Sequence, residues 1–226
     1  MPPRLLQANL NHARAAQDML AQCLAEGGGG LAIVADPYRI PEGNPNWVGD
    51  PSGKVAMVSH HVPGAPPMIP LSAGEDFVMI EYGPIDVMGC YFPTRLKRGE
   101  YEAALDGMES DILSRSPRPV IVGGDLNAHA VAWGSPRTDA RGRLALEFAA
   151  GLGLVLLNRG RVSTYVGTGG ESIVDVTWAS PEALNRVQGW TVETGSLGET
   201  SDHRLISMEL VSPPHGGARA TPPHPG

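Results

Sequence analysis

The segment Gly123–His129 carries the densest group of residues suited to hydrolytic chemistry. It reads Gly-Gly-Asp-Leu-Asn-Ala-His and follows a short apolar run. The two glycines permit a sharp turn, and Asp125 and Asn127, two positions apart, can point into one cleft. There the carboxylate would serve as a base or metal ligand, and the amide would donate a hydrogen bond to a phosphate oxygen. An ordinary Asx turn after a strand uses the same residue types, so this segment alone leaves both interpretations open.

A second polar segment, Thr200–His203, stands just before the last apolar run of the chain. His203 could donate a proton or bind phosphate as an imidazolium, and Asp202 could bind a metal, although a plain polar loop has the same composition. Asp175 lies between two valines in a β-branched run, where an unpaired charge would be costly. We therefore expect Asp175 to have a partner, for which His203 is the natural candidate.

Asn9 and Asp36 each follow an apolar run near the N-terminus. Acidic residues that arrive from several strand ends suit a hard cation such as Mg²⁺, which takes few carboxylates, keeps several waters and binds substrate phosphate. The seven histidines and two cysteines do not form the paired clusters of a zinc site. The sequence therefore favours magnesium over zinc.

Apolar periodicity predicts the elements that must position these residues. Helical spacing predicts helices at about residues 13–24, 101–113 and 141–150. Apolar runs bounded by turn residues predict strands at about 4–9, 31–34, 55–59, 77–82, 85–91, 119–122, 154–157, 162–165, 173–178, 187–192 and 205–211. Since strands dominate and many connections are of hairpin length, we predict an α/β (α+β) fold of two packed sheets covered by helices.

Composition indicates one domain. A chain of 226 residues, 42% hydrophobic, can bury a sizeable core, and we place the domain at residues 1–211. Residues 212–226 are rich in Pro, Gly and His and predict a linker or disordered tail. We expect a soluble protein with no signal peptide or membrane span. Its two cysteines suit an intracellular, reducing compartment.

The formal charge of −7 argues against a protein that grips nucleic acid by bulk electrostatics. Metal-binding carboxylates would account for part of this acidity. The basic residues are also clustered, and each cluster is either a solvated surface or a phosphate contact. The clusters are Arg95 with Lys97 and Arg98, Arg137 with Arg141 and Arg143, and Arg159 with Arg161.

Taken in chain order, the polar motifs resemble those of the endonuclease/exonuclease/phosphatase superfamily, which includes apurinic endonucleases and DNase I. The resemblance covers about Arg4 to Leu210 and rests on Gln7–Asn9, Asp36, Gly89–Pro93, Gly124–Asn127, Val174–Val176 and Ser201–His203. Within the superfamily, Gly123–His129 with Trp133–Ser135, and Ile173–Ser180, are similar to the endonuclease domain of non-LTR (LINE-type) retrotransposons. The opening Leu6–His12 resembles arthropod clades, among them elements that insert in ribosomal RNA genes.

The resemblance implies a DNase I-like four-layer α/β sandwich, in which helices flank two mostly antiparallel sheets. It implies a metal-dependent endonuclease that nicks double-stranded DNA and leaves a 3′-hydroxyl to prime reverse transcription. The partner would be a reverse transcriptase domain of the same polypeptide, with no membrane partner, and the location would be nuclear.

The resemblance also assigns residue roles. Asp36 would hold Mg²⁺, for which Mn²⁺ could substitute, with Asn9 and Asp202 nearby. Asp125 would orient or deprotonate the attacking water, and Asn127 and Tyr91 would hold the phosphate. His203, oriented by Asp175, would stabilise charge in the transition state. One departure stands out: the superfamily generally has Glu where this chain has Asp36.

Family members choose DNA with loops around the cleft, including a hairpin before the strand that carries the histidine-orienting aspartate. This hairpin falls here at about residues 163–171, with Thr168, Gly169 and Gly170 as its turn and with Arg159 and Arg161 nearby. A small, glycine-rich tip could enter a minor groove and sense its shape and deformability. We expect the cluster of Arg95, Lys97 and Arg98 to contact DNA as well.

Other functions are compatible with the same residues. An abasic-site repair endonuclease, or a phosphoesterase acting on lipid or sugar phosphates, would use a similar site because one fold serves many substrates. A catalytically weak DNA-binding module is favoured only by Asp36 and the acidic charge. Metal-dependent turnover would exclude the module.

Overall fold

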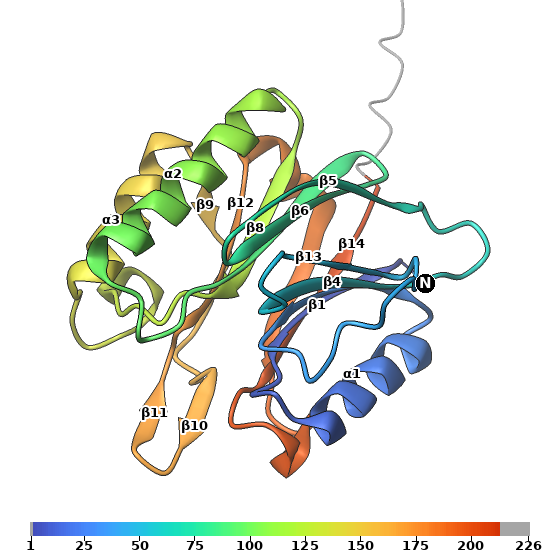
Figure 1. Cartoon of the computed structure of the whole chain (residues 1–226), viewed down its shortest axis with the longest axis horizontal. Helices are drawn as coiled ribbons and strands as arrows, with labels where there is room; N and C mark the ends of the chain where they lie inside the picture. The colour runs from blue at the N-terminus through green and yellow to red at the C-terminus, as the bar shows by residue number, and fades with distance from the viewer. Residues whose placement is uncertain (1, 213–226) are drawn as a thin grey trace, which may run out of the picture.

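Two six-stranded sheets pack face to face in the computed structural model, which describes residues 2–212 (Figure 1). Sheet A has the order β13-β14-β1-β2-β4-β3 and comprises β1 (Arg4–Asn9), β2 (Gly30–Ala35), β3 (Trp47–Gly49), β4 (Val55–His60), β13 (Val187–Glu193) and β14 (Leu205–Leu210). Sheet B has the order β5-β6-β7-β8-β12-β9 and comprises β5 (Met68–Gly74), β6 (Phe77–Tyr82), β7 (Ile85–Tyr91), β8 (Val120–Asp125), β9 (Val155–Leu156) and β12 (Asp175–Ala179).

Helices cover the outer face of each sheet (Figure 1). Helix α1 (Arg14–Glu26) lies on sheet A, while α2 (Arg98–Ser114) and α3 (Ala140–Gly151) lie on sheet B. Short 3₁₀ turns occur at Val131–Trp133, Pro181–Arg186 and Gly198–Thr200. Figure 1 also shows the hairpin of β10 (Tyr165–Gly167) and β11 (Gly170–Ser172) projecting from one end of the sandwich.

Alternation of apolar residues along the strands builds three apolar layers between these four structural layers. In β1, Leu5 packs between the sheets while the next residue, Leu6, packs under α1. In β7, Val87 packs between the sheets and Met88 packs under α2 and α3. Because both faces of these strands are covered, most of their residues are apolar, as in the central strands of layered folds. The predicted four-layer sandwich is confirmed.

Each sheet contains one parallel pair of strands. β1 pairs in parallel with β2 through α1, and β7 pairs in parallel with β8 through α2. The other neighbours in both sheets are antiparallel, as predicted. The parallel pairs contact each other across the sandwich, and the ends of β1 and β8 meet there, since Asn9 Nδ2 donates to Asp125 Oδ2 at 2.8 Å. The carboxyl ends of four strands therefore open at one edge.

A glycine lets the strands of each parallel pair approach closely. Gly124 in β8 has a φ of +155°, and a Cβ there would lie 1.9 Å from the Cys90 carbonyl oxygen. Gly30 in β2 is equivalent, with a φ of +147° and a Cβ position 2.1 Å from the Arg4 carbonyl oxygen. Glycine is required because a side chain would meet rigid backbone at an unfavourable φ. Gly124 also precedes Asp125, so this requirement bears on the chemistry.

The structure corrects several predicted boundaries. The three helices and most strands lie where predicted, but the strand at 162–165 is wrong: Thr164 is buried in a loop, and β10 begins at Tyr165. β12 begins at Asp175 and not at Ile173. Strands β3 and β5 were not predicted. The predicted tail lies outside the described residues beyond Ser212. None of the helices described has the length and apolar character needed to cross a membrane.

Replacing Gly124 with Ala is expected to lower the free energy of unfolding by about 3 kcal/mol, because the new methyl group would collide with the β7 backbone. Gly195→Ala is the matched control, since its Cβ would meet nothing within 4 Å, and should change stability by less than about 0.5 kcal/mol. Chemical denaturation of the two variants checks this. Equal stability would contradict the close approach of β7 and β8.

Candidate active site

The predicted polar residues converge at the edge where the parallel strands end. Asn9 is the last residue of β1, Asp36 follows β2, and Asp125 is the last residue of β8. β12 runs antiparallel to β8, so its first residue, Asp175, pairs with Asp125. His203 lies just before β14 and completes the group. Residues distant in sequence and held by both sheets thus form one site.

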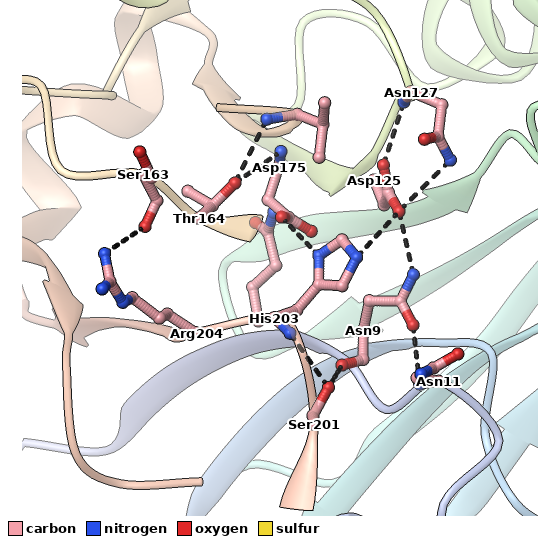
Figure 2. A network of polar contacts seen from close by, with 12 residues as sticks. Asn9, Asn11, Asp125, Asn127, Ser163, Thr164, Asp175, Ser201, His203 and Arg204 are labelled. Atoms are coloured by element: carbon pink, nitrogen blue, oxygen red, sulfur yellow. Dashed lines mark hydrogen bonds and ion pairs between the residues drawn. The ribbon is translucent and has the colours of Figure 1, made fainter. Parts of the chain in front are cut away.

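Asp125 is the buried centre of this group, with 1% of its surface exposed. Its carboxylate accepts hydrogen bonds from Asn9 Nδ2 at 2.8 Å, the Asn127 backbone N–H at 2.9 Å and Asn127 Nδ2 at 3.3 Å (Figure 2). Burial, and then the nearby Asp175 carboxylate, raise the pKa of Asp125 to about 7, against the opposing effects of His203 and the hydrogen bonds. A carboxylate in this range can exchange a proton near neutral pH.

His203 lies between two aspartates (Figure 2). Its Nδ1 is 2.8 Å from Asp175 Oδ2, and its Nε2 is 3.8 Å from Asp125 Oδ2. Burial lowers the pKa of the imidazole, but the charges of Asp175, Asp125 and Asp202 outweigh it and raise the pKa to about 9. The predicted pairing of Asp175 with His203 is confirmed, and His203 is an imidazolium at neutral pH.

The residues around this pair fix its orientation. Thr164 Oγ1 accepts hydrogen bonds from the backbone N–H groups of Val174 and Asp175, both at 3.1 Å. Ser201 Oγ accepts from the His203 N–H and donates to the Asn9 carbonyl. The Tyr165 ring meets the imidazole edge-on at 5.2 Å. Ser201 lay within a predicted motif, whereas Thr164 and Tyr165 were predicted only as part of a strand and hairpin, with no role in the site.

Tyr91 and Asn127 flank the Asp125 carboxylate. Asn127 has a φ of +42° and its Nδ2 also donates to the Phe92 carbonyl at 3.1 Å, so its side chain is held in place. Tyr91 is half-buried, and burial followed by the charges of Asp36 and Asp125 raises its pKa to about 12. Tyr91 therefore keeps its proton at neutral pH and can donate a hydrogen bond to an anion.

Asp36, Asp202 and Asn9 offer the oxygen ligands that the sequence predicts for a metal. Asp36 is half-buried in a left-handed conformation, with a φ of +46°. Burial raises its pKa, and the charges of His12 and Arg95 partly oppose this. Asp202 Oδ1 is buried and has no hydrogen-bond partner among the described residues. A divalent cation would satisfy this orphaned oxygen, and an all-oxygen set suits Mg²⁺.

Asp125, Asp175 and His203 form a second group that could bind a metal ion. Each supplies one potential ligand atom, a carboxylate oxygen or an imidazole nitrogen, and these three atoms lie within 4.8 Å of one another. His203 Nδ1 contacts Asp175 Oδ2, and the Asp125 carboxylate accepts from two asparagines. Asp175 Oδ1, like Asp202 Oδ1, is buried with no hydrogen-bond partner among the described residues. A cation there would have to displace the imidazolium. The donor chemistry therefore fits a metal better on the Asp36 side.

The predicted DNA-binding residues are placed unevenly around the site. Arg95 is exposed beside the site, and its charge acts on both Asp36 and Tyr91. Arg95 and Lys97 line one cavity of about 520 Å³, whereas the Arg98 side chain pairs with Glu102 along α2. Exposed positions beyond β9 and at the hairpin are taken by Arg159, Arg161, Thr168, Gly169 and Gly170.

The hairpin turn is shorter than predicted. Gly167 pairs with Gly170, so Thr168 and Gly169 alone form the turn and Gly170 belongs to β11. Val166 N–H donates to the Asp202 carbonyl at 2.7 Å, which joins the base of the hairpin to the site. A cavity of about 670 Å³ lies between the hairpin and the segment that leads to His203.

Comparisons with solved structures place this fold in a known class. The endonuclease domain of TRAS1, a telomere-specific non-LTR retrotransposon, is 27% identical over 93% of this chain and 99% of its own, with a TM-score of 0.80. An AP endonuclease from Archaeoglobus fulgidus is 17% identical over 92% of this chain and 99% of its own (TM-score 0.71). A 3′-5′ exonuclease from Neisseria meningitidis is 16% identical over 92% and 100% (TM-score 0.69). The predicted DNase I-like fold is thereby confirmed.

The sequence comparison identifies the family. The protein-family model described as endonuclease-reverse transcriptase matches residues 85–207, more than half of the chain. This chain belongs to that family. A search of curated protein sequences gave no significant match.

Replacing Asp175 with Asn should lower the pKa of His203 from about 9 toward the ordinary value near 6.5, because the nearest negative charge is removed while burial remains. Imidazole NMR signals of the metal-free protein followed through a pH titration check this. Protonation of the wild-type His203 stabilises the fold fully below about pH 6.5, and this contribution is lost as pH rises through about 9. An unchanged titration would show that Asp175 does not control this imidazole.

Proposed function

We propose that this chain is a metal-dependent endonuclease that hydrolyses one phosphodiester bond in double-stranded DNA. The observation that carries the proposal is the joint geometry of the site. The buried Asp125 carboxylate and the His203 imidazolium, which Asp175 orients, lie beside the carboxylates of Asp36 and Asp202. Asp202 Oδ1 is buried and has no hydrogen-bond partner among the described residues. The 27% identity to the TRAS1 endonuclease domain over almost the whole chain supports it.

The catalytic roles follow from charge and proton state. Asp125, with a pKa near 7, takes a proton from water as the water oxygen attacks phosphorus. The bond between phosphorus and O3′ breaks and the departing O3′ takes a proton from solvent, which leaves a 3′-hydroxyl and a 5′-phosphate. His203 donates a hydrogen bond from Nε2 to the phosphate, where negative charge builds in the transition state. Tyr91 and Asn127 bind other phosphate oxygens, so the phosphate is held before the attack.

Asp36 and Asp202, with Asn9 nearby, hold the metal in this proposal. A bound Mg²⁺, or Mn²⁺ in its place, supplies positive charge at the phosphate. Asp36 stands where the superfamily generally has Glu, and its side chain is one methylene shorter. Aspartate is tolerated in the left-handed conformation found at this position more readily than most residues. We infer that the shorter carboxylate weakens metal affinity more than it moves the site.

The biological setting is target-primed reverse transcription by a mobile element. The family description joins an endonuclease to a reverse transcriptase, which supports a reverse transcriptase domain as the partner in the same polypeptide and a nuclear location. A net charge of −7 suggests weak DNA binding by this domain alone and dependence on that partner. The opening segment Leu6–His12 favours a target in ribosomal RNA genes.

Nicking of supercoiled plasmid tests the proposed function. The wild type should convert supercoiled to open-circular DNA only with Mg²⁺ or Mn²⁺, while Asp125→Ala and His203→Ala should lower the rate by about 100-fold or more. Intact duplex, abasic duplex and a soluble phosphomonoester in parallel separate the alternatives. Exclusive cutting of abasic duplex would favour a repair enzyme. A folded wild type that cuts none of the three would leave only a binding module.

The β10–β11 hairpin is proposed to select the cleavage position through groove shape. Replacing its two-residue turn, Thr168–Gly169, with a longer loop should move nick positions on a long duplex, because the tip would reach a different depth in the groove. Primer extension from the nicked strand maps the positions. The same insertion at Gly64, an exposed turn far from the site, is the control and should leave the pattern unchanged. An unaltered pattern in the hairpin variant would remove this role.

A further inference from the structure

Arg141, in the first turn of α3, makes an unusual set of contacts for a basic residue near a DNA-cleaving site. Its guanidinium donates to four backbone carbonyls of one loop: Phe92 at 3.5 Å, Pro93 at 3.1 Å, Thr94 at 3.0 Å and Leu96 at 2.7 Å. Its Cζ also lies 5.0 Å from the centre of the buried Tyr101 ring. Both terminal nitrogens are thus committed to protein.

The loop that Arg141 holds runs from the end of β7 to the start of α2. Tyr91 immediately precedes it, and Arg95 lies within it. Its carbonyls have no strand partner, so one guanidinium, with its planar fork of donors, satisfies them together. Since the charge of Arg95 acts on Asp36 and Tyr91, the conformation of this loop determines where positive charge stands beside the proposed metal.

The same arginine is linked to Asn127. The Phe92 carbonyl accepts from Arg141 and also from Asn127 Nδ2, and the Phe92 N–H donates to the Asp125 carbonyl at 2.9 Å. The position of Phe92 therefore links Arg141 to two site residues, Asn127 and Asp125.

Arg141 itself is held rigidly against the loop that follows Asn127. Asp139 Oδ1 caps α3 by accepting from the Gly142 N–H at 2.7 Å, and its Oδ2 accepts from the His129 N–H and lies 3.0 Å from His129 Nδ1. Gly142 packs so closely that a Cβ would lie 2.0 Å from the His129 carbonyl oxygen. The first turn of α3 is therefore fixed to the segment that carries Asp125 and Asn127.

We propose that Arg141 is a positioning residue for phosphate binding, which clamps the loop 92–96 so that Tyr91, Arg95 and Asn127 present their donors to the scissile phosphate together. This rests on the proposed endonuclease function. It also separates Arg141 from its basic neighbours Arg137 and Arg143, which are exposed. Arg141 contributes order and not a direct contact with DNA, because both of its terminal nitrogens already donate to the loop.

The test compares Arg141→Met and Arg141→Lys with Arg143→Met, which removes one positive charge from the exposed side of the same helix. Arg141→Met should lower kcat by about 10- to 100-fold through misplaced phosphate contacts, whereas Arg143→Met should stay near the wild type. Lysine keeps the charge but not the fork, so Arg141→Lys should retain an intermediate rate. Equal rates for Arg141→Met and Arg143→Met would overturn the proposal.

A double-mutant cycle separates positioning from a general loss of stability. If Arg141 acts through the loop, Arg95→Met should cost less in the Arg141→Met background than in the wild type, because Arg95 is already displaced there. Independent, multiplicative effects in variants that remain folded would contradict the coupling. Arg141→Lys supplies the second arm of the cycle if Arg141→Met folds poorly.

Hydrogen exchange provides a readout that does not need activity. The Leu96 N–H donates to the Pro93 carbonyl at 3.1 Å and should exchange faster in Arg141→Met than in Arg143→Met. Unchanged exchange across residues 94–96 would overturn the clamp even if the wild type nicks DNA. An inactive wild type with faster exchange in Arg141→Met would instead reject the endonuclease function and leave the clamp intact.

Discussion

The burial of the Asp125 carboxylate between the two sheets is the constraint on which the rest of the structure depends. A charge removed from water needs partners, and here they come from both sides of the sandwich. Asn9, at the end of β1, approaches from sheet A, and Asn127 follows β8 of sheet B. The parallel pairs β1–β2 and β7–β8 must therefore end at the same level. The interaction that aligns the sheets also builds the proposed catalytic centre.

The site carries more negative than positive charge, which accounts for much of its chemistry. Asp36, Asp125, Asp175 and Asp202 face one imidazolium and Arg95. Such a group repels a DNA phosphate until a cation neutralises part of it, so metal binding and substrate binding are coupled. The net negative charge of the sequence argues against DNA binding by bulk electrostatics. Part of that charge is concentrated in this site, where the carboxylates of a metal-dependent nuclease would bind the cation.

Residues on central strands could be predicted from the sequence, because covered strands are largely apolar runs whose ends are visible. Asn9, Asp36, Asp125 and His203 fall at such ends and lie together as expected. β5 was missed because it is a half-exposed edge strand interrupted by Pro70. The role of Arg141 was also invisible, since a basic cluster in sequence does not reveal which of its members turns inward to backbone carbonyls of a distant loop. Only the tertiary structure shows which arginine of the cluster makes these contacts.

We infer that one scissile phosphate binds between a metal held by Asp36 and Asp202 and the Asp125–His203 pair. A crystal structure with a short DNA duplex and Mn²⁺, with the metal located by its anomalous scattering, tests it most directly. We expect one strong peak beside Asp36 and Asp202, with a DNA phosphate between this peak and His203 Nε2. A peak enclosed by Asp125, Asp175 and His203, or a phosphate remote from both groups, would contradict it.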